Sequence, residues 1–291
     1  MRPLVELRYD FDVTKSLGDI IDVLKTAALI QFRAFQLKQK PNEEYLKETQ
    51  DCLRLLLEKK VDHPYLFGGR GSALGIVVIT SDGGFLGELN TLLVNAALDL
   101  RKSKEDEIIV LGERGARYLE DAGEKFSSLP GISDEIQYKE VESLADNLVK
   151  GFRERFNKVL IIYPLFVSIS SQRITTKQIL PLISEEEKQA GEKNKHGWGR
   201  SIEEMLIEPS FSAVLEGLME VLMGYRLMEI FWSSKQSEFA ARIMHLEGST
   251  QELNSLNSKL SFEYFRQVHA LKDKVIREIS ASKLLLTRGK N

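Results

Sequence analysis

The stretch whose residue types come nearest to a chemical site is Ser81–Asn90, with the sequence SDGGFLGELN. It lies between an expected strand, Leu74–Thr80, and an expected helix, Glu88–Leu100. In a doubly wound α/β fold, such a strand-to-helix turn is where phosphate groups bind. The stretch lacks the GxGxxG spacing and the GK[ST] ending, and Asp82 and Glu88 would repel a phosphate. A tight turn that requires glycine is therefore favoured over a nucleotide site.

Other residues that commonly perform chemistry form no recognisable set. The four histidines show no metal-ligand spacing relative to one another or to the single cysteine, Cys52. No Ser/His/Asp combination can be selected either. We therefore expect no catalytic residue, no cofactor and no metal. A lone cysteine also excludes a disulfide framework within the chain and fits a reducing compartment.

Length and charge narrow the class of protein. The chain has 291 residues, enough for one large or two ordinary domains, and a net charge of -3 from 40 basic and 43 acidic residues. This balance argues against a nucleic-acid partner. No stretch reaches the length of apolar sequence that a membrane span needs, and the N-terminus lacks the apolar core of a signal peptide. We therefore expect no direct membrane insertion, and any membrane association has to come through partners.

The element that organises the chain is a long C-terminal helix over Pro209–Leu286. Beyond Pro209 the stretch contains no proline, and about 78 residues at ~1.5 Å each would make a rod of about 115 Å. Charges in every turn exclude a membrane span, so a run of this length indicates a coiled coil or a helical repeat. Its apolar residues recur three and four positions apart, which makes one face that needs a partner. They are Phe239, Ile243, Leu246, Leu253, Leu256, Leu260, Tyr264, Val268, Leu271, Val275 and Ile279.

Two amphipathic stretches near the N-terminus are candidates for this partner. The first has helical spacing over Val13–Phe35, with Thr14 or Ser16 as its N-cap, and Pro41 is expected to end or bend it. The second resumes the pattern over Glu43–Lys60. They are either two helices of a globular bundle or, for the first, the partner of the C-terminal rod.

The middle of the chain changes to strand–helix alternation, which argues for a mostly parallel sheet with helices on both faces. Pro164 indicates a bulge or an edge position within the third expected strand. The fourth expected strand is a candidate for an antiparallel strand. The expected strands are Leu74–Thr80, Glu107–Gly112, Lys158–Ile169 and Thr175–Leu182, and the expected helices are Glu88–Leu100, Ala116–Ala122 and Val141–Phe156.

This layout predicts an α/β protein in which a domain is inserted between two helical ends. The segments are an N-terminal helical segment over 1–62, an α/β globular domain over 63–208 and a long C-terminal helix over 209–291. Two functions fit this layout. One is a coiled-coil adaptor with an inserted α/β binding module, and the other is a nucleotide-dependent enzyme that uses the turn at Ser81–Asn90.

Five parts of the chain carry a family resemblance: Val78–Asn90, Ile179–Leu182, Trp198 with Ile207–Ser210, Ser237–Leu246 and Phe262–Ser280. Together they resemble the gamma subunit of F-type ATP synthases, the central rotor stalk. The resemblance covers nearly the whole chain, and the sequence is similar in particular to the alternate-operon type of F-type ATPase. Departures include Gly83, where the family usually has arginine, and His245, within a run of methionines and alanines.

The resemblance implies a non-catalytic subunit of an ion-transporting rotary ATPase. Its terminal helices would form a long antiparallel coiled coil inside the catalytic hexamer of alpha and beta subunits, with a Rossmann-like α/β domain outside. The foot would rest on the membrane c ring and an epsilon subunit. Rotation would couple ion flow to ATP synthesis or hydrolysis, at the cytoplasmic face of the inner (plasma) membrane. Neither the coupling ion, proton or sodium, nor the direction of the reaction follows from this sequence.

The resemblance also implies residues at the subunit interface of the shaft and its tip. Charged shaft residues would make transient contacts with the hexamer, although an ordinary solvated helix charge is an equal alternative for each. The apolar tip would turn within an apolar collar. The expected interface residues are Arg33, Lys38, Arg242, Arg266, Glu278, Leu284, Leu285 and Leu286.

Overall fold

The computed structural model describes residues 2–37, 43–57, 71–182 and 207–288. The side chains of residues 43, 54, 55, 57 and 282–288 lie outside that description. The chain forms two compact units: a helix-pair unit, Met1–Ile30 with Ile243–Asn291, and an α/β unit, Gln31–Arg242. None of the described helices is both long and apolar enough to cross a membrane. The division into segments 1–62, 63–208 and 209–291 stays a prediction.

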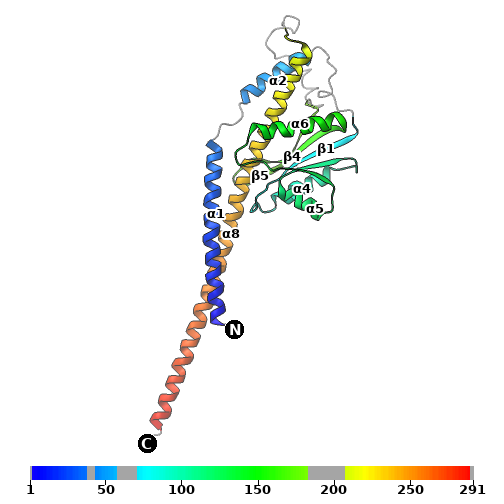
Figure 1. The fold of residues 1–291 in the computed structure, drawn as a ribbon. Coiled ribbons are helices and arrows are strands. Elements are labelled where there is room, and N and C mark those ends of the chain that lie inside the picture. The colour runs from blue at the N-terminus through cyan, green and yellow to red at the C-terminus, as the bar shows by residue number, and fades with distance from the viewer. Residues whose placement is uncertain (1, 38–42, 58–70, 183–206, 289–291) are drawn as a thin grey trace. The chain divides into compact units, whose positions relative to one another are not determined.

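Six helices and five strands are described (Figure 1). The helices are α1 (Leu4–Leu37), α2 (Glu43–Leu57), α4 (Leu89–Leu100), α5 (Glu113–Asp121), α6 (Tyr138–Glu154) and α8 (Phe211–Arg288). The strands are β1 (Ala73–Ile79), β2 (Glu107–Leu111), β3 (Phe126–Leu129), β4 (Phe156–Ser168) and β5 (Ser171–Leu180).

The five strands form one sheet in the order β3-β2-β1-β4-β5. The first four are parallel to one another and β5 is antiparallel to β4, as the sequence suggested. Successive side chains of β1 point to opposite faces of the sheet, because side chains alternate along a strand. Val77 and Ile79 pack in the core that contains α6 and the start of α8, whereas Ile76 and Val78 pack in the core with α4. Burial on both faces explains the continuous apolar run of this strand.

One strand was missed, and the position of Pro164 was predicted correctly. The strand β3 was not expected, because its sequence FSSL has no apolar run and its two serines are exposed. Of the bulge and the edge position expected at Pro164, the structure has the edge position. The last pair of β4 with β1 is Ile162 with Val78. The missing N–H of Pro164 therefore lies where β4 has β5 as its only described neighbour.

Asp106 fixes the start of β1 and the loop before β2. Its carboxylate accepts hydrogen bonds from the backbone N–H groups of Leu74 (2.9 Å), Lys102 (3.0 Å) and Ser103 (2.8 Å). Burial alone would raise the pKa of this carboxyl. The three hydrogen bonds and the nearby Arg101 charge outweigh burial, so the pKa of Asp106 lies below its usual 3.8.

We expect Asp106→Asn to destabilise the protein by about 1–3 kcal/mol at neutral pH, the usual contribution of hydrogen bonds to a charged group. Because the folded-state pKa is lowered, the carboxylate stabilises fully above its unfolded pKa of about 3.9, and this stabilisation is lost as the pH falls through the folded value. Urea unfolding of both proteins between about pH 7 and pH 2.5 measures the difference. A difference that does not shrink in acid would contradict this assignment.

In the helix-pair unit, α1 and α8 run antiparallel. Lys25 Nζ lies 3.1 Å from Glu247 Oε2, and Thr250 Oγ1 donates to Asp22 Oδ1 at 3.4 Å. Nearer the start of α1, Thr14 hydrogen-bonds Asn257. The residue numbers of the paired positions therefore decrease along α1 as they increase along α8, which is an antiparallel arrangement. This pairing confirms that the first segment is the partner of the C-terminal helix.

Apolar burial between the paired helices follows part of the expected stripe. Leu7, Ala28, Leu246 and Leu260 are buried. The helix α1 begins at Leu4, so the expectation that Thr14 or Ser16 caps it is wrong. Thr14 Oγ1 instead donates to the carbonyl of Asp10, one turn earlier in the same helix, at 2.8 Å.

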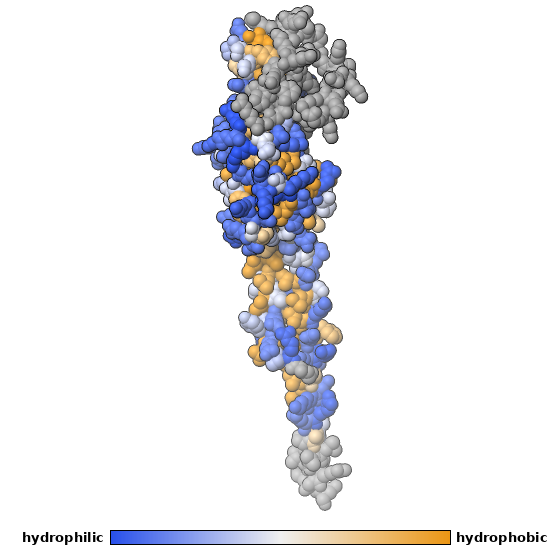
Figure 2. All heavy atoms as spheres, turned by 90° about the vertical axis from the view of Figure 1, so that its right-hand side faces the viewer, coloured by the Kyte–Doolittle hydropathy of each residue, from blue (hydrophilic) through white to orange (hydrophobic). Residues whose placement is uncertain are grey.

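The described side chains of α8 after Val268 are all exposed. Leu271, Val275, Ile276 and Ile279 are each exposed to between 50% and 60%. Other apolar side chains of this unit are exposed too, among them Val5 and Phe262. Figure 2 shows hydrophobic residues, in orange, at the surface between hydrophilic ones. Exposed apolar side chains on this scale indicate a surface that contacts other molecules.

Candidate functional site

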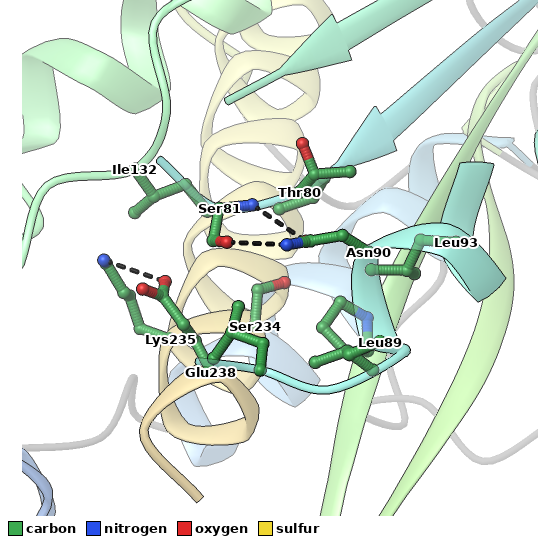
Figure 3. A pocket seen from close by; sticks show the side chains of 12 residues that line it. Thr80, Ser81, Leu89, Asn90, Leu93, Ile132, Ser234, Lys235 and Glu238 are labelled. Carbon is green, nitrogen blue, oxygen red and sulfur yellow. Dashed lines mark hydrogen bonds and ion pairs between the residues drawn. The ribbon is translucent and has the colours of Figure 1, made fainter. Parts of the chain in front are cut away.

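The polar atoms of the turn that follows β1 form hydrogen bonds that stabilise the turn itself (Figure 3). Asn90 Oδ1 accepts from the N–H of Ser81 at 3.2 Å, and Asn90 Nδ2 donates to Ser81 Oγ at 2.9 Å. Ser81 Oγ in turn donates to the carbonyl of Gly83 at 2.9 Å. Thr80 Oγ1 donates to the carbonyl of Leu111 on the neighbouring strand at 2.7 Å. These contacts tie the turn to the first helical residues of α4 and to β2.

Asp82 has a structural partner at the same edge of the sheet. Its Oδ1 accepts from the N–H of Glu113 at 2.9 Å, at the first residue of α5. A carboxylate in this position satisfies a free N–H and interacts favourably with the helix dipole. A Cβ added to Gly131 would collide with the Asp82 carboxylate, so the loop after β3 also confines it. The Asp82 carboxylate, whose charge disfavours phosphate binding, therefore stabilises the N-terminus of α5.

The space between this turn and α8 is too small for a nucleotide. The cavity lined by Ser81, Asn90, Lys235 and Glu238 has a volume of about 10 Å³ (Figure 3). That is about the room needed by one water molecule, and small-molecule sites are usually larger than ~300 Å³. The carboxyl edge of the sheet is thus closed by α8, which leaves no room for a phosphate-bearing ligand there.

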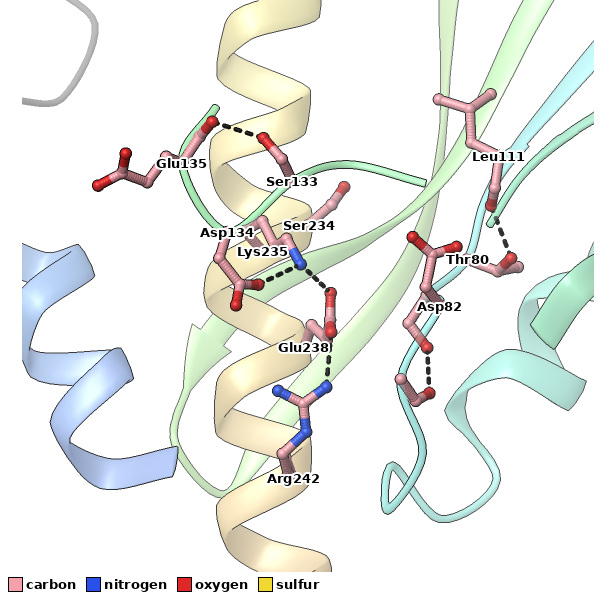
Figure 4. A network of polar contacts seen from close by, with 12 residues as sticks. Thr80, Asp82, Leu111, Ser133, Asp134, Glu135, Ser234, Lys235, Glu238 and Arg242 are labelled. Carbon is pink, nitrogen blue, oxygen red and sulfur yellow. Dashed lines mark hydrogen bonds and ion pairs between the residues drawn. The ribbon is translucent and has the colours of Figure 1, made fainter. Parts of the chain in front are cut away.

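A chain of charged side chains closes the edge (Figure 4). Lys235 Nζ lies 2.9 Å from Asp134 Oδ1 and 2.9 Å from Glu238 Oε2. Glu238 Oε1 lies 2.7 Å from Arg242 Nη2. Arg242 Nε reaches the carbonyl of Gly84 at 3.4 Å, near the usual limit of a hydrogen bond. We name these residues, Asp134, Lys235, Glu238, Arg242 and Gly84, the edge network.

Burial makes the edge network electrostatically strong. The side chains of Lys235, Glu238 and Arg242 are only 6%, 11% and 16% exposed. Burial would lower the pKa of Lys235, but the charge of Glu238 and the hydrogen bonds to Asp134 and Glu238 outweigh it and raise that pKa above its usual value. The ammonium is therefore charged throughout the physiological range.

The edge network also explains the glycine at position 83. A Cβ at Gly83 would lie 2.6 Å from Arg242 Nη2, and a Cβ at Gly84 would lie 3.1 Å from Arg114 Nη2. A larger residue at position 83 would push the guanidinium away from the turn. Gly83, a departure from the family's usual arginine, is therefore the residue that lets Arg242 approach.

The expected interface residues stay a prediction, and the described ones among them are divided between the two units. Arg33 is exposed on α1, and Arg242 is half-buried in the edge network. In the helix-pair unit, Arg266 and Glu278 are exposed on α8, where Glu278 lies 4.0 Å from Lys274. Lys38 lies outside the described residues. Leu284, Leu285 and Leu286 belong to α8, but their side chains lie outside the description.

Sequence reasoning missed Lys235, Glu238 and Asp134. The first two lie three positions apart on α8, and Arg242 follows four positions later, so the three share one helix face. Charges repeated at that spacing beside the buried Phe231 and Phe239 were the available signal. Asp134 carries no such pattern. Within the described residues, no group of histidine, cysteine, aspartate or glutamate could hold a metal ion.

Comparison with known proteins agrees with this architecture. The sequence model of the family described as ATP synthase matches residues 4–281. The chain is similar to the ATP synthase gamma chain of Staphylococcus haemolyticus (strain JCSC1435), with 27% identity over 96% of this chain and 97% of the relative. It is similar to that of Staphylococcus aureus (strain JH9), with 26% identity and the same coverage.

Solved structures show the same fold. A chain of the Euglena gracilis mitochondrial ATP synthase, described as OSCP/F1/c-ring in rotational state 3, is similar with a TM-score of 0.68 and 17% identity over 99% of this chain and 96% of that chain. A chain of the Tetrahymena thermophila mitochondrial ATP synthase central stalk/cring has a TM-score of 0.54 and 17% identity over 82% of this chain and 99% of that chain.

The fold, a pair of antiparallel terminal helices with an α/β domain inserted between them, is that of an ATP synthase central stalk. The chain belongs to the ATP synthase family, and within it to the gamma subunits that form the central stalk of the rotor. The adaptor alternative has no support among these relatives.

Proposed function

We propose that this gamma subunit couples ion flow through a membrane ring to ATP synthesis or hydrolysis by rotating inside a catalytic hexamer. Its partners are the alpha and beta subunits of the hexamer, an epsilon subunit and the c ring. Relatives named as ATP synthase gamma chains and a similar chain from an F1/c-ring assembly support these partners. The chain would lie at the cytoplasmic face of the membrane, held there through its partners, and would supply no catalytic side chain itself.

The observation that carries this proposal is the single helix α8. Its 78 residues contribute to both the α/β unit and the helix-pair unit. In the α/β unit, Leu227 and Phe231 are buried in the core beneath the sheet. In the helix-pair unit, Leu246 and Leu260 are buried. A helix without an interior proline resists bending, so it suits the transmission of torque.

The exposed apolar residues of α8 suit the part of the shaft that turns within the hexamer. Beyond Val268 the described side chains of α8 are all exposed, and Leu271, Val275 and Ile279 are each exposed to between 50% and 52%. Apolar surface packs without directional bonds, so it permits sliding. Arg33, Arg266 and Glu278 are exposed charges that we propose make transient contacts with the hexamer.

Copurification from native membranes tests this function. A tagged chain is expected to recover a large assembly that hydrolyses ATP, with one copy of this subunit among several larger subunits. Recovery of a monomer or a small homo-oligomer, without an ATPase partner at low or high salt, would overturn the proposal. Low salt matters because surface charge contacts weaken as ionic strength rises.

Deletion of Lys283–Asn291 tests the proposed apolar tip. We expect a weaker torque or a lower yield of assembled complex, because Leu284–Leu286 would no longer contact the collar. The α/β unit should stay folded, since its core lies elsewhere in the sequence. The measurements are ATP-driven ion pumping by the assembled complex and thermal unfolding of the isolated subunit. Unchanged pumping and assembly would count against the tip.

A further inference from the structure

Within the α/β unit, α8 changes the way in which it is held. Leu215, Leu222, Leu227 and Phe231 are all at most 2% exposed, and they pack in the core that lies against one face of the sheet. One turn after Phe231, the ionic contacts of the edge network join the apolar packing, which continues at the buried Phe239. Apolar packing is non-directional, whereas hydrogen bonds and ion pairs depend on distance and angle. The edge network can therefore fix the angular position of α8, which apolar packing up to Phe231 defines less sharply.

The edge network holds two separate loops against one face of α8. Lys235 reaches Asp134, in the loop between β3 and α6, and Arg242 reaches Gly84, in the turn between β1 and α4. Glu238 lies between the two cations and contacts both. Figure 4 shows these side chains in one row along the helix. Rotation of α8 about its own axis, or a shift by one turn, would break contacts with both loops.

The small size of the adjoining cavity strengthens this arrangement. The Lys235 side chain is only 6% exposed, and the adjoining cavity has room for about one water molecule, so little solvent can replace the contacts of its ammonium group. An ammonium group left unpaired in such a place is strongly unfavourable. Rotation of α8 to a different angular position is therefore unfavourable for two reasons. It leaves a buried charge without a partner, and it breaks hydrogen bonds.

We propose that the edge network is a register lock that fixes the angular position of α8 within the α/β unit, with Lys235 as its central positioning residue. This inference rests on the proposed rotary function. In a rotor, torque that enters through the α/β unit reaches the shaft only if the two turn together. A loosened lock lets α8 slip relative to the sheet, so ATP is hydrolysed with fewer ions moved.

The test uses the whole membrane complex with Lys235→Met, which keeps an unbranched side chain of nearly the same length and removes its charge. ATP hydrolysis and ATP-driven ion pumping are measured on the same vesicles. We expect the ratio of ions pumped to ATP hydrolysed to fall at least twofold per assembled complex. A residue with only a structural role would lower assembly but leave this ratio unchanged. Lys235→Arg keeps the charge and should restore most of the ratio.

Lys177→Met is the matched control. Lys177 on β5 pairs with Glu229 on α8 at 2.9 Å, so it also joins the sheet to α8, but these side chains are 35% and 51% exposed. Its loss should leave the ratio of pumping to hydrolysis unchanged. If Lys235→Met does not assemble, Asp134→Asn replaces it. The Asp134 side chain is 56% exposed, and Lys235 keeps Glu238 as a partner in that variant.

The outcomes separate the lock from the rotary function itself. A wild-type complex that pumps ions, with an unchanged ratio in the assembled Lys235→Met or Asp134→Asn variant, overturns the lock and leaves the function standing. A wild-type preparation that neither assembles nor pumps overturns the proposed function, and the lock with it. A reduced ratio in the variant and an unchanged ratio in Lys177→Met support the lock.

Discussion

Leu260→Asp is expected to unfold the helix pair of α1 and α8. Leu260 is 7% exposed, and among the described side chains of α8 it is the last apolar one that is buried. Removing a buried leucine side chain costs about 2–5 kcal/mol. An unpaired carboxylate in its place adds a further cost of at least about 1–3 kcal/mol. The sum approaches the whole stability of a small structural unit, commonly about 5–15 kcal/mol.

Thermal melting followed by circular dichroism measures this change, because the affected unit is helical over Leu4–Ile30 and Ile243–Arg288. Leu256→Asp is the matched control, since Leu256 lies one turn earlier on the same helix and is 43% exposed. The control should melt within a few degrees of the parent protein. A Leu260→Asp variant that melts with the parent would disprove the assignment of this seam.

Gly112→Ala is expected to destabilise the α/β unit by about 3 kcal/mol or more, through backbone strain and overpacking together. Gly112 joins β2 to α5 with φ +102°, a conformation that residues with a side chain rarely adopt. A Cβ there would lie 2.6 Å from the carbonyl oxygen of Thr80 and 2.9 Å from Thr80 Oγ1. The carbonyl belongs to the backbone at the end of β1, so it cannot move aside without disturbing the sheet.

Gly123→Ala separates strain from collision. Gly123 also has a positive φ, +70°, but a Cβ there would meet nothing within 4 Å. We expect it to cost about 1–2 kcal/mol, the strain of the left-handed conformation alone. Urea unfolding of both variants gives the comparison. Equal losses in the two proteins would show that contact with Thr80 contributes nothing.

The sequence predicted the long elements well, because their patterns are local. The apolar steps from Phe239 to Val268 and the absence of proline defined α8, and continuous β-branched runs defined β1, β2 and β4. The pairing of α1 with α8 was one of two alternatives, because two amphipathic stripes can also be buried within a globular bundle. Gly18 lies well inside α1 and has nothing within 4 Å of its Cβ position.

What the sequence could not predict depends on tertiary partners. β3 is a strand because β2 offers a free edge to Phe126–Leu129, and nothing in FSSL itself demands that pairing. The edge network depends on Asp134 lying beside Lys235, although 101 positions separate them. Arg242 was expected on the shaft surface, and its contact with another subunit stays a prediction. Its known contacts are Glu238 and Gly84.

Direct observation of rotation tests the central claim. Cys52→Ser with Lys104→Cys places one thiol on an exposed loop of the α/β unit, to which a bead is attached. With the catalytic hexamer fixed to a surface, ATP should drive sustained rotation of the bead in one direction, and removal of ATP should stop it. A bead that stays still, or only fluctuates, on complexes that hydrolyse ATP would contradict the account.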